Sequence, residues 1–165
     1  LTRSGAKVGD RLCVSGTLGD AAAGLAVLSG QLAVDESAAA FLTMRYARPS
    51  ACLALGEVLR NCATSCIDIS DGLLADAAHI ATASGVGLEI DSALLPFSEA
   101  LGSLADSEQS LDWALAGGDD YELLFTLPSS MPLPSGCTEM GRVLAGSGIS
   151  CDRTPEHIGY DHFRR

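Results

Sequence analysis

Residues 65–76 read SCIDISDGLLAD, and this stretch decides how the chain folds. It begins inside a compact apolar run, residues 63–69, which predicts a buried strand. It ends inside residues 71–84, where apolar side chains recur at the spacing of one helix face. The junction carries two carboxylates and a hydroxyl, those of Asp68, Ser70 and Asp71. The sequence therefore predicts a strand that passes directly into a helix, with polar groups gathered at the turn.

Patterns on both sides of this stretch predict further strands and helices. Strands are expected at residues 11–15, 86–90, 121–127, 138–144 and 148–152, and helices at residues 21–28, 37–46, 51–61, 97–104 and 110–116. Asp20 is expected to cap the first of these helices, and residues 145–147 are expected to join the last two strands as a hairpin. Strands and helices alternate through the middle of the chain before strands accumulate. The expected fold class is therefore α/β (α+β), a mixed β-sheet layered with α-helices.

The composition restricts the class of protein. The chain has 165 residues, 47% of them hydrophobic, so one domain can bury a proper core. Its net charge of −11 argues against nucleic acid as a partner, because Lys and Arg drive binding to phosphate backbones. No apolar run approaches the roughly 18 residues that span a bilayer, so no membrane association is expected. The six cysteines are expected to be reduced and to act as small hydrophobic residues, with a zinc site or disulfides as the alternative.

The acceptors at the strand–helix junction suit a metal–nucleotide site. Unpaired N–H groups of a first helical turn favour anions, and the Ser70 hydroxyl can donate to a phosphate. Two carboxylates would repel a bare phosphate, but they become useful when Mg²⁺ lies between them and the phosphates. A structural alternative stays open from the spacing alone, in which Ser70 or Asp71 caps the helix and Asp68 is solvated at the end of the strand.

A second polar cluster, GGDDYE at residues 117–122, lies between a predicted helix and a predicted strand. The two glycines would let a ligand approach the backbone closely, and Asp119 could accept hydrogen bonds from a cationic or amino-bearing group. Because neighbouring carboxylates are costly when unpaired, a cation is their natural partner. The alternative is a glycine that ends the helix, followed by a solvated turn.

Seven motifs occur in one order along the chain: RSGAKVGD, VSGTLGDAAAGL, RYARPS, IDISDGLLADAAHI, LLPFSEAL, WALAGGDDYELLFT and GYDHF. Together they resemble the C-terminal domain of the thiamine-monophosphate kinases, within the superfamily of aminoimidazole ribonucleotide synthetase and selenophosphate synthetase. The resemblance covers nearly the whole chain, and IDISDGLLAD and GGDDYELLF are its most specific parts.

The resemblance implies a reaction and a set of residues. ATP would transfer its terminal phosphate to thiamine monophosphate, giving thiamine diphosphate and ADP, with Mg²⁺ ions and in the cytoplasm. By motif, Mg²⁺ would be held by Asp68 and Asp71, ATP by Arg3 and Ser70, and thiamine monophosphate by Asp119 and Tyr160. No residue is expected to act as a covalent nucleophile or acid–base catalyst, since phosphoryl transfer depends on alignment and charge neutralisation.

The resemblance also implies a domain organisation. Residues 1–165 would be a single C-terminal domain that binds ATP and substrate, and the N-terminal domain of the full enzyme, with further metal-binding acids, would be absent. The fragment alone is then expected to be inactive, and the full-length protein is expected to be a homodimer. Two rival interpretations are another ATP-dependent enzyme of the same superfamily and a non-catalytic ligand-binding module.

Overall fold

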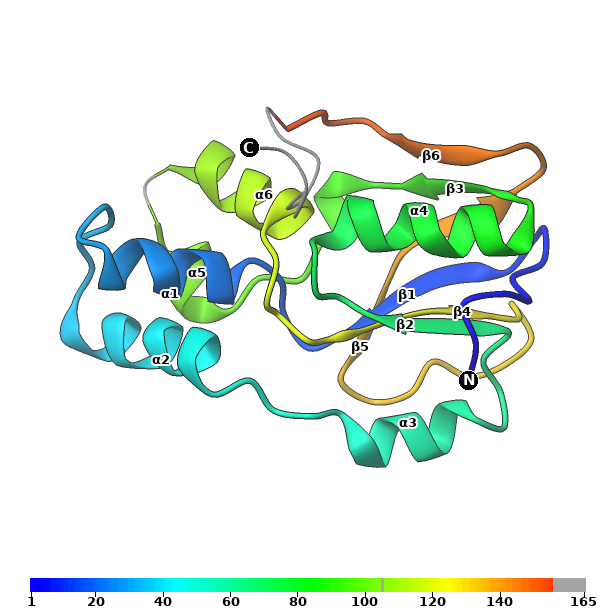
Figure 1. Ribbon diagram of the computed structural model, residues 1–165, viewed down its shortest axis with the longest axis horizontal. Coiled ribbons are helices and arrows are strands. Elements are labelled where there is room, and N and C mark those ends of the chain that lie inside the picture. The colour runs from blue at the N-terminus through cyan, green and yellow to red at the C-terminus, as the bar shows by residue number, and fades with distance from the viewer. Residues whose placement is uncertain (105, 156–165) are drawn as a thin grey trace.

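A mixed β-sheet forms the body of the molecule (Figure 1). The computed structural model describes residues 1–104 and 106–155, and within them the sheet has six strands. These strands are β1 (Arg11–Ser15), β2 (Ser65–Asp68), β3 (Gly87–Ile90), β4 (Leu123–Leu127), β5 (Cys137–Leu144) and β6 (Gly148–Cys151). Their order is β2-β4-β1-β5-β3-β6. The β3–β6 pair is parallel and the other four pairs are antiparallel.

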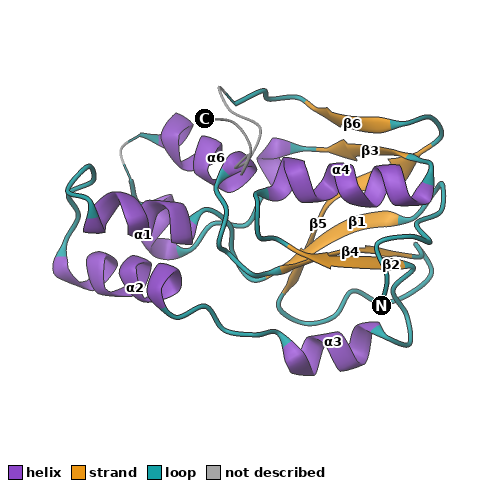
Figure 2. Ribbon diagram, in the orientation of Figure 1, coloured by secondary structure: helices purple, strands orange, loops and turns teal. Residues whose placement is uncertain are grey.

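Helices lie on both faces of the sheet and beyond one end of it (Figure 2). They are α1 (Asp20–Leu28), α2 (Glu36–Ala47), α3 (Leu53–Leu59), α4 (Leu73–Ser84), α5 (Glu99–Gly102) and α6 (Ser107–Ala116), with a 3-10 turn at Ser92–Leu94. Helix α4 packs on one face, against β2, β3, β4 and β6. Helices α1, α2 and α5 lie together beyond the end of the sheet (Figure 1). The expected fold class, a mixed sheet layered with helices, is confirmed.

Alternating side chains divide the core between the two faces of the sheet. On β1, Leu12 and Val14 belong to the cluster under α4, whereas Cys13 belongs to the opposite cluster, which includes Leu59 of α3 and Phe125 of β4. All five side chains are fully buried. Successive strand residues point to opposite faces, so this sheet needs apolar residues at consecutive positions. The apolar strand at residues 65–68 follows the same rule.

Two local predictions are wrong. Residues 145–147 do not close a hairpin, because β5 lies between β1 and β3 and already bonds to both, so β6 pairs in parallel with β3 instead. Asp20 does not cap α1, whose N-cap is Gly19. The Asp20 carboxylate is buried and accepts hydrogen bonds from the hydroxyls of Thr17 (2.6 Å) and Ser98 (2.5 Å).

The six cysteines are free, and the prediction of small hydrophobic side chains fits the two buried ones, Cys13 and Cys66, whereas the Cys52 thiol donates a hydrogen bond to Glu122 (3.4 Å). Cys13 and Cys66 are buried in the core cluster between the sheet and α3. Burial raises the pKa of the Cys13 thiol to about 12 and that of the Cys66 thiol to about 11. Over the part of the chain that the structure describes, no helix has the length and apolar character needed to cross a membrane.

Candidate functional site

The strand–helix turn has the form expected from the sequence. Ile67 and Ile69 are buried on one side of the chain, and Asp68 is exposed on the other. Helix α4 begins at Leu73 after Gly72, whose φ of 114° is a conformation that favours glycine. The N-cap residue of α4 is Gly72, which has no side chain, so neither Ser70 nor Asp71 occupies the N-cap position itself.

A buried carboxylate from inside α4 holds the turn in place. Asp76 is 2% exposed, and it accepts hydrogen bonds from the backbone N–H groups of Ser70 (2.9 Å) and Asp71 (3.0 Å). Burial raises the pKa of Asp76, while these two donors act in the opposite direction. The protein itself thereby satisfies the backbone donors of the turn, and Ser70 and Asp71 line the adjoining cavity.

Backbone hydrogen bonds join this turn to the second polar cluster. The pairing of β2 with β4 ends at Asp68 and Leu123. After this pair, the N–H of Ile69 donates to the Glu122 carbonyl (2.8 Å), and the N–H of Tyr121 donates to the Ile69 carbonyl (2.9 Å). The Asp119 N–H then donates to the Ser70 carbonyl (3.0 Å). The two polar clusters, about 50 residues apart in the sequence, therefore form one continuous structure.

Glycine is required at the point of closest approach. A Cβ atom at Gly118 would lie 2.5 Å from the Ser70 carbonyl oxygen, which is closer than real Cβ atoms come. Gly117 ends α6 at its C-cap, which agrees with the helix-ending role considered from the sequence. The glycine pair thus ends one helix and admits the neighbouring turn.

The joined turns line a cavity of about 740 Å³. Its polar wall includes Ser70, Asp71, Asp119 and Tyr121, and its apolar wall is Ala21, Ala22, Leu25 and Tyr46 from α1 and α2. Asp68 lines a second cavity of about 660 Å³ with residues 49–53 and Arg60. Tyr121 lines both cavities, so its ring lies where the two spaces meet.

Asp71 and Asp119 line one cavity and Asp68 lines the other, and the charges of all three act on Tyr121, which lines both. The pKa of Tyr121 is raised, first by the charge of Asp119 and by a hydrogen bond to its side chain, then by smaller effects that include the charges of Asp68 and Asp71. Carboxylates that act together in this way create a negative potential that favours a bound cation. Carboxylate oxygens are also the donors that Mg²⁺ and Ca²⁺ prefer.

Arg3, another residue that the sequence singled out, lies elsewhere. Arg3 is exposed, and its backbone carbonyl accepts a hydrogen bond from Ser84 (3.3 Å), at the opposite end of α4 from Ser70. It does not line either of the two cavities described above. Tyr160 lies outside the described residues.

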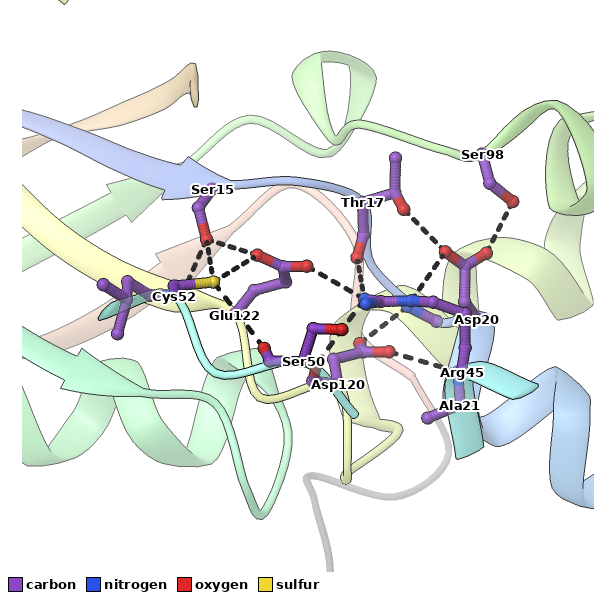
Figure 3. Close-up of polar contacts among 12 residues, drawn as sticks. Ser15, Thr17, Asp20, Ala21, Arg45, Ser50, Cys52, Ser98, Asp120 and Glu122 are labelled. Carbon is purple, nitrogen blue, oxygen red and sulfur yellow. Dashed lines mark hydrogen bonds and ion pairs between the residues drawn. The ribbon is translucent and has the colours of Figure 1, made fainter. Parts of the chain in front are cut away.

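Sequence reasoning missed a buried polar network behind the cavity (Figure 3). Arg45 of α2 forms ion pairs with Glu122 (2.9 Å) and Asp20 (3.6 Å). Asp120 accepts hydrogen bonds from the N–H groups of Gly19 (2.7 Å) and Ala21 (3.2 Å), and so satisfies the start of α1. The sequence predicted a cation beside the acids of the GGDDYE cluster. For Glu122, that cation is the guanidinium group of Arg45. The motif supplied the acids, but their inward direction depends on the backbone of Tyr121, whose positive φ leaves no signal in the sequence.

Burial gives Asp120 an unusual titration. It raises the pKa of this carboxyl to about 7, and the backbone donors and Arg45 offset only part of the effect. The pKa of Asp120 is higher in the folded protein than in the unfolded chain. The contribution of this group to the free energy of unfolding is therefore fully present below pH ~4 and is lost as the pH rises to about 7, by at most about 1.4 kcal/mol per pH unit.

We therefore expect Asp120→Asn to gain in stability relative to wild type between pH 4 and 7. Urea unfolding of both proteins at several pH values measures this difference, and subtraction removes the titration of other groups. A constant difference across this range would contradict the prediction.

Comparisons with known proteins define the family to which the chain belongs. Residues 7–147 match the family model described as AIR synthase related protein, C-terminal domain. The chain belongs to this family. Within it, the chain is 46% identical to the thiamine-monophosphate kinase of Escherichia coli K12 over 181 aligned positions, which cover 99% of the chain and 55% of that relative. The enzyme of Aquifex aeolicus VF5 is 41% identical over 98% of the chain and 54% of the relative. The chain thus spans about half the length of the curated relatives it matches.

Solved structures give the same result. A structure described as AaThiL complexed with AMPPCP and TMP has a TM-score of 0.88 and 41% identity, over 98% of this chain and 53% of that one. Thiamine-monophosphate kinase from Stenotrophomonas maltophilia K279a has a TM-score of 0.85 and 40% identity, over 92% and 52% of the two chains. Escherichia coli HypE, at 22% identity and a TM-score of 0.71 over 97% and 53% of the chains, shares the fold.

Proposed function

We propose that this chain is the C-terminal half of a thiamine-monophosphate kinase, which transfers the terminal phosphate of ATP to thiamine monophosphate. The observation that carries the proposal is the hydrogen bond from the Asp119 N–H to the Ser70 carbonyl (3.0 Å). It joins the motif assigned to the nucleotide to the motif assigned to the acceptor, so donor and acceptor would meet at one cavity. Relatives with this name, 41% and 46% identical over nearly the whole chain, support the assignment.

The polar residues that the motifs assign have distinct parts in this proposal. The Ser70 hydroxyl donates to a phosphate oxygen of ATP, and Arg3 pairs with another phosphate once the complete site is assembled. The Asp119 carboxylate orients the acceptor through an amino-bearing or cationic group, and Tyr160 contributes a second substrate contact. The apolar wall of α1 and α2 excludes water from the reacting phosphates.

Asp68 and Asp71 would hold Mg²⁺. The donor set around Asp71 fits a hard cation, because oxygen atoms or ring nitrogens of Asp71, Asp76 and His79 lie within 4.8 Å of one another. Asp68 lines the neighbouring cavity and is assigned by its motif. When bound, Mg²⁺ would neutralise the phosphates and keep them in line for transfer. The protein's own contribution is the fixed turn, whose backbone Asp76 holds.

A direct assay tests the function. We expect the full-length protein to form thiamine diphosphate from thiamine monophosphate only with both ATP and Mg²⁺, and the isolated chain of residues 1–165 to form none. The isolated chain is the matched control, because it contains every residue assigned above but would lack the acids of the N-terminal half.

Two outcomes would contradict the proposal. Turnover by the isolated chain would remove the need for a second domain. Failure of the full-length protein to turn over or bind thiamine monophosphate would favour another reaction of the same superfamily or a non-catalytic module. A homodimeric full-length protein and a cytoplasmic location remain predictions, which gel filtration and cell fractionation can test.

A further inference from the structure

Residues 119–122 alternate between the cavity and the interior. Asp119 and Tyr121 are exposed and line the cavity, whereas Asp120 and Glu122 are 2% and 7% exposed. This segment precedes β4 and is not itself a strand, so strand geometry does not account for the alternation. The unusual feature is that the two inward residues are both carboxylates and that each is engaged by several donors.

The two outward residues have an unfavourable backbone conformation. Asp119 has a φ of 67° and Tyr121 a φ of 52°, and within the described residues they are the two non-glycine residues with positive φ. Aspartate tolerates this region better than most residues, but tyrosine rarely enters it. Such a conformation persists only when the surrounding structure imposes it, and it is found disproportionately at functional sites.

Asp120 anchors the segment to α1. Its carboxylate spans the first turn of that helix through the N–H groups of Gly19 (2.7 Å) and Ala21 (3.2 Å). Helix α1 also supplies Ala21, Ala22 and Leu25 to the apolar wall of the cavity. One side chain therefore fixes the polar segment relative to the opposite wall.

Glu122 anchors the other end of the segment to β1, α2 and the start of α3. Its carboxylate accepts hydrogen bonds from the Ser15 hydroxyl and from the Cys52 thiol (3.4 Å), and it pairs with Arg45 (2.9 Å), as Figure 3 shows. The Ser15 hydroxyl oxygen also accepts the N–H of Leu123 (2.8 Å). These contacts leave the chain before Leu123 little freedom to rotate.

We propose that Asp120 and Glu122 are positioning residues, whose buried carboxylates hold the backbone of Asp119 and Tyr121 in the left-handed conformation and so present these side chains to the cavity. The effect of these two residues on substrate binding rests on the proposed function, whereas their effect on the backbone conformation of Asp119 and Tyr121 does not. Neither carboxylate touches the cavity, so each acts through its outward neighbours.

The main test uses Glu122→Ala in the full-length protein. We expect a crystal structure of this variant to show negative φ at Tyr121, and KM for thiamine monophosphate to rise about 10- to 100-fold with a smaller change in kcat. Glu122→Gln keeps the shape and acceptor and should remain within about threefold of wild type. The matched control is Asp10→Ala, which removes another buried carboxylate, bonded to the Lys7 N–H (3.0 Å) and the Thr64 hydroxyl (2.6 Å). It should lower the unfolding temperature and leave KM unchanged.

The results separate this inference from the proposed function. Unchanged φ values and KM in Glu122→Ala, with only a lower unfolding temperature, would overturn the inference. If wild type shows no kinase activity, the proposed function fails, and the φ values of the variant still decide the inference.

A second measurement covers the case in which Glu122→Ala does not fold. The Asp119→Gly variant should have an unfolding temperature about 2–4 °C above that of the Asp119→Ala variant, because only glycine accepts positive φ without strain. The difference should shrink in an Asp120→Ala background, since loss of that anchor imposes less strain. Equal unfolding temperatures for Asp119→Gly and Asp119→Ala in the otherwise wild-type protein would overturn the inference.

Discussion

Asp71→Asn lowers kcat/KM of the full-length protein for thiamine monophosphate by about 10²- to 10³-fold, the expected cost of losing one charge-stabilising group at a phosphoryl-transfer site. The amide keeps the size of the side chain but is a much weaker ligand for a hard cation. The Mg²⁺ concentration for half-maximal activity should rise in parallel.

The control for this variant is Glu36→Gln, which makes the same change of charge at an exposed position in the first turn of α2, away from both cavities. It should leave the activity and the Mg²⁺ dependence at wild-type values. Equal activity of Asp71→Asn and wild type would remove Asp71 from the mechanism, and equal loss in both variants would show that only the overall charge matters.

Gly118→Ala destabilises the chain by about 2–3 kcal/mol, because the new Cβ would lie 2.5 Å from the backbone oxygen of Ser70. Backbone atoms cannot move aside as a flexible side chain can, so the two turns must separate. Separation breaks the bond between the Asp119 N–H and the Ser70 carbonyl, and affinity for thiamine monophosphate should fall with stability. Urea unfolding and calorimetric titration measure the two effects.

Gly56→Ala is the matched control, because nothing lies within 4 Å of a Cβ atom at this position in α3. In the interior of a helix the change should stabilise the protein by about 0.5–1 kcal/mol. A Gly118→Ala protein as stable as wild type would mean that the two turns do not need their close contact.

The sequence was informative where a local rule acts alone. The strand at residues 65–68 and helix α4 were predicted because an apolar run and a helical repeat each dictate one element. The outward direction of Asp68 followed from strand alternation, and the exposed Asp68 agrees with it. The partners of a strand carry no such local signal, which is why the hairpin of residues 138–152 was predicted wrongly.

The candidate site was predictable to a similar degree. The motifs indicated which acids gather there, but not that Asp76 holds the turn or that Arg45 pairs with Glu122. Asp20 was expected to cap its own helix, because aspartate favours that position. In the fold the cap comes from Asp120, 100 residues away in sequence, and long-range contacts of this kind leave no spacing to recognise.

The place of β5 has a consequence for biosynthesis. This strand joins β2, β4 and β1 on one side to β3 and β6 on the other. A nascent chain that has not yet emerged beyond residue 136 would hold the three strands β2, β4 and β1 together and β3 without any strand partner. Assembly must therefore wait for distant partners, which slows it and leaves the unfinished product prone to aggregation until the last quarter of the chain is made. Chaperone dependence should accordingly be greatest for ribosome-bound chains that stop just short of Cys137.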